Sequence, residues 1–147
     1  MKSAMERLRK ACQLSLRDWM VLGHAWVLFL VIELGLSLLS FRSLLTLCRR
    51  YSRCGQLGSS SASIERLAWL TAVAGRCSPV RTTCLRQALV LSILLERRGI
   101  PTSLRIGVSR QAGELAAHAW LEQNGRIIPG VQGRDGFEPL LPEVSAP

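Results

Sequence analysis

Aromatic residues are scarce in this chain, and basic residues far outnumber acidic ones. Phe, Trp and Tyr together make up 5% of the 147 residues, and nineteen Lys plus Arg against ten Asp plus Glu give a net charge of +9. A basic balance suits nucleic acid, an anionic membrane surface or an acidic partner. Nucleic-acid binding usually adds aromatic residues among clustered basic ones, or a recognisable motif, and the sequence has neither. We therefore predict no nucleic-acid partner.

The cysteines lack the spacing of a metal site or a disulfide framework. They are odd in number, irregularly spaced and without a C-x-x-C pair: Cys12, Cys48, Cys54, Cys77 and Cys84. Zinc sites and small disulfide scaffolds both depend on recognisable spacings. A zinc site that combines Cys54, Cys77 and Cys84 with His118 can be drawn, but no spacing supports it. We predict no metal or cofactor, and a reducing compartment, the cytoplasm.

Apolar residues, in contrast, are abundant and gather near the N-terminus. They form 48% of the chain, whose mean hydropathy is +0.23. A basic, amphipathic segment at 1–18 predicts a helix, and the stretch 19–41 that follows has Glu33 as its single formal charge. The length suits a membrane span, but a carboxylate inside lipid costs several kcal/mol. We favour two shorter helices that are buried or face a partner, and leave a membrane contact through residues 19–41 open.

One segment resembles a linker. Residues 55–63 are rich in Gly and Ser, and they separate a basic and hydrophobic helical region, 1–54, from a second region, 64–147. At the start of this second region, Ser63 is placed to cap a helix that runs to about residue 74.

The clearest helix boundaries in the second region surround Cys84. Thr82 or Thr83 can cap the helix that follows, and Gly99 can end it. Because residues 88–95 are apolar on nearly every face, this helix should be buried. Cys84 then lies in its first turn, where unpaired N–H groups and the helix dipole stabilise a thiolate over a thiol. Cys84 is therefore a candidate nucleophile; a small apolar residue at a buried helix start is the alternative.

The periodicity changes after this helix. Alternating patterns at 104–108 and 115–122, an Asn124-Gly125 turn and a return strand at 126–128 predict a small antiparallel sheet. His118 lies in the second strand, on the face opposite to that of the neighbouring alanines. A strand histidine is more often structural, but a nucleophile earlier in the chain gives it a role as general base.

A thiol at a helix N-terminus followed by a strand histidine is the arrangement of papain-like cysteine enzymes. The chain also resembles the leader-peptidase domain of lasso peptide biosynthesis proteins, in the transglutaminase-like group of papain-fold enzymes. The resemblance covers roughly residues 64–140. It implies an α+β fold in which the cysteine helix packs on a small antiparallel sheet, after a hydrophobic helical region. The matching blocks are CLRQAL from Cys84, RRGIP from Arg97, RIGV from Arg105 and AHAWLE from Ala117, followed by Gly125 and Arg126.

This resemblance implies a peptidase that removes the leader from a ribosomally made lasso precursor, with Cys84 as nucleophile and His118 as base. It also implies three partners, namely the precursor peptide, a small leader-recognition protein and an asparagine-synthetase-like lasso cyclase. The family usually completes a triad with an acidic residue after the histidine, where this chain has Gly130. Asp135 is our candidate and Gln132 the alternative, since an amide can also orient an imidazole. A solvated turn residue is the simpler interpretation of Asp135.

Two other functions stay open from the sequence. A transglutaminase-like acyl transferase would pass the acyl group from Cys84 to an amine instead of water. A non-catalytic scaffold or membrane adaptor would bind through its charge and its apolar N-terminal region. Cys84→Ala separates the two enzymes, which would lose activity, from the scaffold, which would not.

Overall fold

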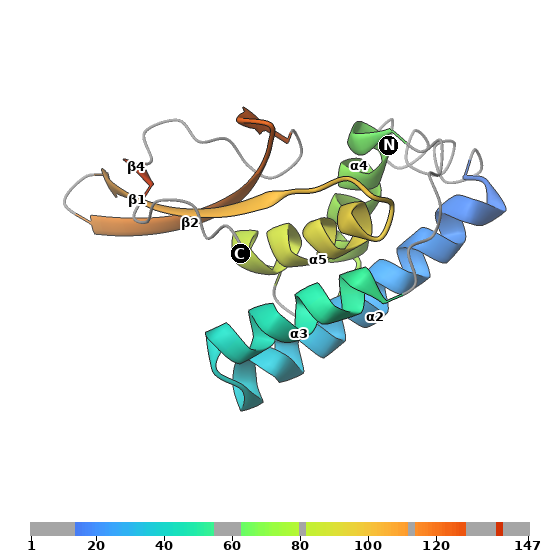
Figure 1. Ribbon diagram of the computed structural model, residues 1–147, viewed down its shortest axis with the longest axis horizontal. Helices are drawn as coiled ribbons and strands as arrows, with labels where there is room; N and C mark the ends of the chain where they lie inside the picture. The colour runs from blue at the N-terminus through green and yellow to red at the C-terminus, as the bar shows by residue number, and fades with distance from the viewer. Residues whose placement is uncertain (1–13, 55–62, 80–81, 112–113, 129–137, 140–147) are drawn as a thin grey trace, which may run out of the picture.

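The computed structural model describes residues 14–54, 63–79, 82–111, 114–128 and 138–139. Figure 1 shows α2, α3 and α5 below a small, strongly curved sheet, with α4 beside it. The α+β class predicted from the sequence is confirmed. Within the described residues the elements are α2 (Leu16–Leu38), α3 (Phe41–Arg53), α4 (Ile64–Arg76), α5 (Cys84–Glu96), β1 (Ser103–Gln111), β2 (Glu114–Gln123), β3 (Arg126–Ile127) and β4 (Glu138–Pro139).

The apolar stretch 19–41 contains one long helix, so our prediction of two shorter helices within it is wrong. α2 has 23 residues and starts with a capping box in which Ser15 and Asp18 bond each other's backbone N–H groups. Its interior glycines do not end it, because a glycine inside a helix costs only about 1 kcal/mol. A helical pair does form, but between α2 and α3, which begins after the N-cap Ser40 and folds back along α2 (Figure 1). Residues 1–13 lie outside the described part of the chain.

The helix starts predicted in the second region are confirmed. Ser63 caps α4 by accepting the Arg66 N–H at 3.2 Å, and Thr83 caps α5 by accepting the Arg86 N–H at 3.4 Å. α4 runs slightly beyond its predicted end, to Arg76. After α5 the chain turns at Gly99, whose φ of +76° is the left-handed conformation that glycine adopts without strain.

The sheet is antiparallel, with strand order β3-β2-β1-β4. The two long strands, β1 and β2, pair in a continuous register that sets Gly107 opposite His118. β1 runs to Gln111 and β2 begins at Glu114, so both strands extend beyond the alternating patterns at 104–108 and 115–122 that predicted them. The hairpin from β2 to β3 turns at Asn124 and Gly125, whose φ values of 50° and 75° are those of the predicted tight turn.

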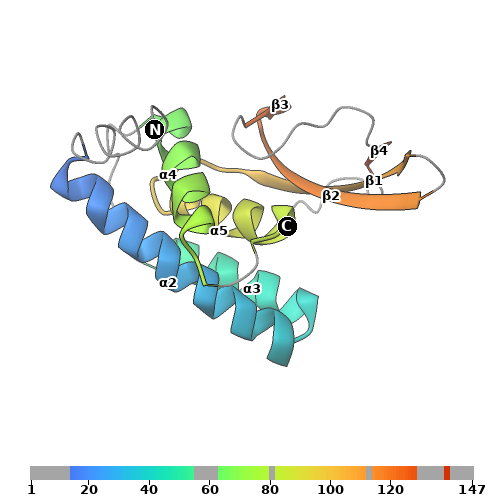
Figure 2. The same cartoon turned by 180° about the vertical axis from the view of Figure 1, so that it is seen from behind.

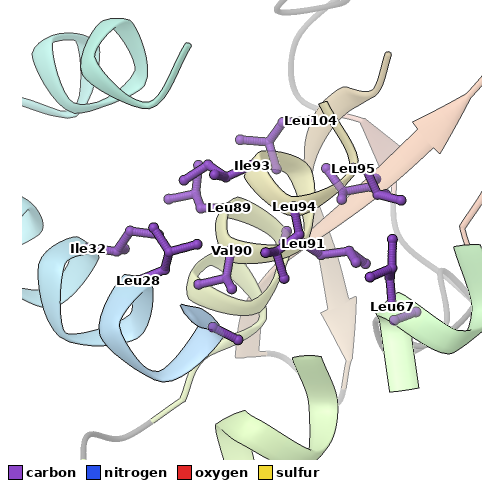
Figure 3. Packing of buried hydrophobic residues seen from close by; sticks show 14 of the residues in the cluster. Leu28, Ile32, Leu67, Leu89, Val90, Leu91, Ile93, Leu94, Leu95 and Leu104 are labelled. Carbon is purple, nitrogen blue, oxygen red and sulfur yellow. The ribbon is translucent and has the colours of Figure 1, made fainter. Parts of the chain in front are cut away.

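One hydrophobic core joins the helices to the sheet. α5 lies at its centre, with α2, α3 and α4 on one side and β2 and β1 on the other (Figures 1 and 2). Figure 3 shows the side chains of α5 packed between those of α2 and α4. The core therefore runs across the linker-like segment that divides the sequence. Its labelled members are Leu28, Ile32, Leu67, Leu89, Val90, Leu91, Ile93, Leu94, Leu95 and Leu104.

Candidate functional site

Cys84 is the first residue of α5, as the sequence predicts. The segment that leads into α5 is fixed by Thr82, whose hydroxyl donates to the Gly75 carbonyl oxygen at 2.6 Å. Cys84 itself is half-buried against the hydrophobic core. Backbone N–H groups in the first turn of a helix have no intrahelical acceptor, so they can stabilise negative charge on a thiolate.

The other cysteines that the structure describes lie at different positions on their helices. Cys54 and Cys77 are the C-caps of α3 and α4, at the negative ends of the helix dipoles. Cys48 is half-buried within α3, and burial raises the pKa of its thiol to about 11. Among these described cysteines, Cys84 alone begins a helix.

His118 lies in the middle of β2 and is only 8% exposed. Its ring stacks with that of Trp120, with the centroids 6.3 Å apart and the planes at 20°. Ala117 before it is exposed, whereas Ala119 after it is buried, so both faces of β2 are covered from His118 onwards. Its cross-strand partner, Gly107, has no side chain and is itself buried.

The elements that carry the thiol and the imidazole are neighbours. α5 packs on β2, and both views place the first turn of α5 against this strand (Figures 1 and 2). Further along β2, Leu121 lies opposite Leu104 of β1, and Leu104 packs beside Ile93 of α5 (Figure 3). Leu121 therefore faces α5. Alternation along the strand would place His118, three residues before Leu121, on the opposite face. Side-chain directions rotate along a twisted strand, and β2 is visibly curved. Direct pairing of Cys84 with His118 stays a prediction.

Polar contacts fix the residues next to His118. The indole N–H of Trp120 donates to Glu122 Oε1 at 3.0 Å, and Arg105 Nε donates to Glu122 Oε2 at 3.1 Å. The Glu122 carboxylate therefore holds the ring on which the imidazole stacks. Sequence reasoning missed this role of Glu122, which appears once the cross-strand register is known.

An ion pair joins the cysteine helix to α2. Arg86, in the first turn of α5, pairs with Glu33, the one charged residue of the apolar stretch 19–41. Glu33 therefore faces the cysteine helix and has a cation beside it. Sequence reasoning identified the carboxylate as costly but missed its partner, because nothing in the spacing of residues 33 and 86 connects them.

The candidates for the third catalytic residue, Asp135 and Gln132, lie outside the described residues, as does Gly130. The orienting group for His118 therefore stays a prediction. The zinc site considered from the sequence gains no support, since no three His, Cys, Asp or Glu side chains gather as metal ligands within the described ranges.

The chain belongs to the transglutaminase-like superfamily, whose pattern matches residues 26–142. This match includes most of α2 as well as α5 and the sheet, so it crosses the linker-like segment as the core does. The superfamily includes cysteine peptidases and acyltransferases, and its members are commonly enzymes. Neither a curated protein nor a solved structure matches the chain.

Proposed function

We propose that the chain is a cysteine peptidase that removes the leader from a ribosomally synthesised lasso precursor peptide. The observation that carries the proposal is the half-buried Cys84 thiol at the first residue of the central helix, packed against the strand of His118. Membership of the superfamily supports acyl chemistry on a thiol. The resemblance of the blocks around Cys84 and His118 to leader peptidases supports this substrate class.

In the proposed reaction, the imidazole of His118 takes the proton of the Cys84 thiol. The thiolate attacks the carbonyl carbon of the scissile peptide, and the imidazolium then protonates the leaving amine as the C–N bond breaks. An acyl thioester remains on Cys84. Water, deprotonated by the same imidazole, attacks this thioester, so that a carboxylic acid leaves and the thiol is restored. The Cys84 backbone N–H is suited to bind the oxyanion of both tetrahedral intermediates.

The remaining roles follow from the same proposal. Asp135, or Gln132 in its place, would orient the imidazole through the second ring nitrogen. A small leader-recognition protein would present the precursor, and the asparagine-synthetase-like cyclase would receive the freed peptide. We propose a cytoplasmic location for this complex, where the free thiol stays reduced.

Leader release in a reconstituted mixture tests the proposal. The purified chain is incubated with the precursor and the leader-recognition protein encoded beside it, and the products are identified by mass spectrometry. Cys84→Ser and His118→Ala should stay folded and release no leader, whereas Cys77→Ser, at an exposed thiol, should cleave normally. Leader release by either of the first two variants would overturn the assignment.

Acyl transfer to an amine is the second candidate, because the superfamily includes acyltransferases. Both reactions pass through a thioester on Cys84, so only the acceptor differs. Adding a primary amine to the same mixture distinguishes them: a peptidase gives the free acid, and an acyltransferase gives a new amide. A non-catalytic scaffold would give neither product and would still support maturation after Cys84→Ala.

A further inference from the structure

The outer face of α2 is apolar and exposed. α2 is long and apolar enough to cross a membrane, with a mean hydropathy of 2.0 in its best window, of which 28% is buried. A core helix or a signal sequence can have the same properties. The exposed residues recur every three to seven positions along the helix, with side chains between 48% and 78% exposed. They are Met20, Val27, Val31, Leu34 and Leu38.

α3 extends this apolar face. Leu47 and Tyr51 are both exposed, and the Tyr51 hydroxyl lies 3.0 Å from His24 Nε2 of α2, so the two helices form one continuous surface. An exposed tryptophan, Trp19, lies on α2 as well. Tryptophan is typical of the boundary between lipid and water, because its ring is apolar and its N–H is polar.

The charge around this surface is positive. Residues 15–54 contain five arginines and two acidic residues. Both acids are paired with arginines outside this segment, Asp18 with Arg66 and Glu33 with Arg86. The exposed arginines of the segment are therefore not balanced by its own carboxylates. They are Arg17, Arg42, Arg50 and Arg53.

The same ion pairs show how the helix can meet lipid. They hold α2 to α4 at one end and to α5 further along, while its inner face is part of the core. A spanning orientation would break both pairs and expose the apolar side of α5. An in-plane contact keeps them and covers only the face that is already exposed.

From these observations we infer that the outer face of α2 and α3 docks in the plane of an anionic lipid membrane. Its apolar side chains enter the interface, and the arginines bind the lipid head groups. A protein partner could cover an apolar face equally well, but the unbalanced arginines favour an anionic surface. The inference goes beyond the proposed function and does not depend on thiol chemistry.

Vesicle flotation with the full chain tests this docking. The protein should float with vesicles that contain phosphatidylglycerol and stay behind with vesicles of phosphatidylcholine alone, and salt should weaken binding. Bound protein should be released by carbonate, as a helix lying in the interface is and a spanning helix is not. Equal binding to both vesicle types, absence of binding, or resistance to carbonate would each overturn the inference. None of these outcomes bears on leader release by Cys84.

Matched variants locate the contact. Val31→Glu and Leu34→Glu should each lower vesicle affinity by at least about tenfold. Arg50→Gln and Arg53→Gln should each lower it about fivefold, the usual effect of one basic residue near an anionic surface. Ile127→Glu, on exposed β3, is the control for the apolar substitutions and should bind as the unmodified protein does.

Circular dichroism confirms that each variant is folded, and light scattering reports its mass. If the unmodified protein bound no vesicles and Leu34→Glu changed the measured mass, the face would be assigned to contact with a second copy of the chain. If the control Ile127→Glu lost as much affinity as Val31→Glu, the contact would lie elsewhere. The way in which vesicle binding by the unmodified protein depends on lipid charge and salt tests the inference even if a variant fails to fold.

Discussion

Replacing Arg86 with methionine should destabilise the protein, because it leaves the Glu33 carboxylate of α2 without its cation. Methionine keeps much of the length of the arginine stem, so the packing of the first turn of α5 changes little. Removing one partner of a fully buried ion pair costs about 3–5 kcal/mol, whereas an exposed pair contributes about 0–1 kcal/mol. The side chains of Arg86 and Glu33 are 18% and 31% exposed, which places this pair between the two limits. We expect a loss of about 2 kcal/mol.

A double-mutant cycle separates the pairing from other effects of substitution. Glu33→Gln combined with Arg86→Met should be more stable than the sum of the single changes predicts, with a coupling of about 1–2 kcal/mol. Denaturant unfolding followed by circular dichroism measures the free energies. The single change Arg86→Met should also lower the melting temperature by about 4–8 °C in a chain of this length.

Arg50→Met is the matched control, since Arg50 is exposed on α3. It should change the free energy of unfolding by no more than about 0.5 kcal/mol. A coupling below about 0.3 kcal/mol between positions 33 and 86 would refute the reasoning, since α2 would then not be held to the cysteine helix by this pair. One of the two ion pairs from which the in-plane orientation of α2 is inferred would then give no evidence for it.

Three further predictions concern packing, acid stability and thiol reactivity. A Cβ added at Gly75 would lie 3.0 Å from the nearest methyl group of the segment entering α5, so Gly75→Ala should cost about 1–2 kcal/mol in denaturant unfolding. Gly23→Ala, with nothing within 4 Å, should instead stabilise α2 by about 0.5–1 kcal/mol. The hydrogen bond from Arg66 lowers the pKa of Asp18 from 3.8 to about 2. A carboxyl group whose pKa is lower in the folded than in the unfolded chain stabilises the fold at pH values above its unfolded pKa. This contribution is therefore present above about pH 4 and is lost as the pH falls towards 2. Asp18→Asn should remove about 1 kcal/mol at neutral pH, a value reduced for solvent screening, and should flatten acid unfolding in that window. Iodoacetamide at mildly alkaline pH should label the exposed cysteines and spare Cys48, whose pKa of about 11 keeps its thiol protonated. Mass spectrometry identifies the labelled residues, and rapid labelling of Cys48 would contradict its burial.

The local signals in the sequence were sufficient for several elements. Ser63 and Thr83 start their helices, and Asn124-Gly125 forms the hairpin turn. These features depend on a few adjacent residues whose hydrogen bonds and φ values are set locally. The predicted extent of α2 was wrong because the end of this helix is not set by a few adjacent residues. Whether a glycine or a serine ends an apolar helix depends on what packs against the helix, which periodicity does not reveal.

The two-residue strand β4 had no sequence signal, because its pairing with β1 is between segments far apart in the chain. The same limit applies to the site. The first-turn position of Cys84 followed from its capping residues and the strand position of His118 from alternation. The contacts of Glu122 with Trp120 and Arg105 required the cross-strand register.

The sequence by itself determined the kind of residue at each key position: a thiol at a helix start, a histidine within a strand, and a single carboxylate in an apolar stretch. These are properties of short windows, where capping, dipole and alternation act over a few residues. Only the tertiary structure decided which elements meet. It set α5 against β2, gave Glu33 its partner Arg86, and divided α2 into a buried side and an exposed apolar side. Such contacts depend on long-range packing, which cannot be inferred from the spacing of residues along the chain.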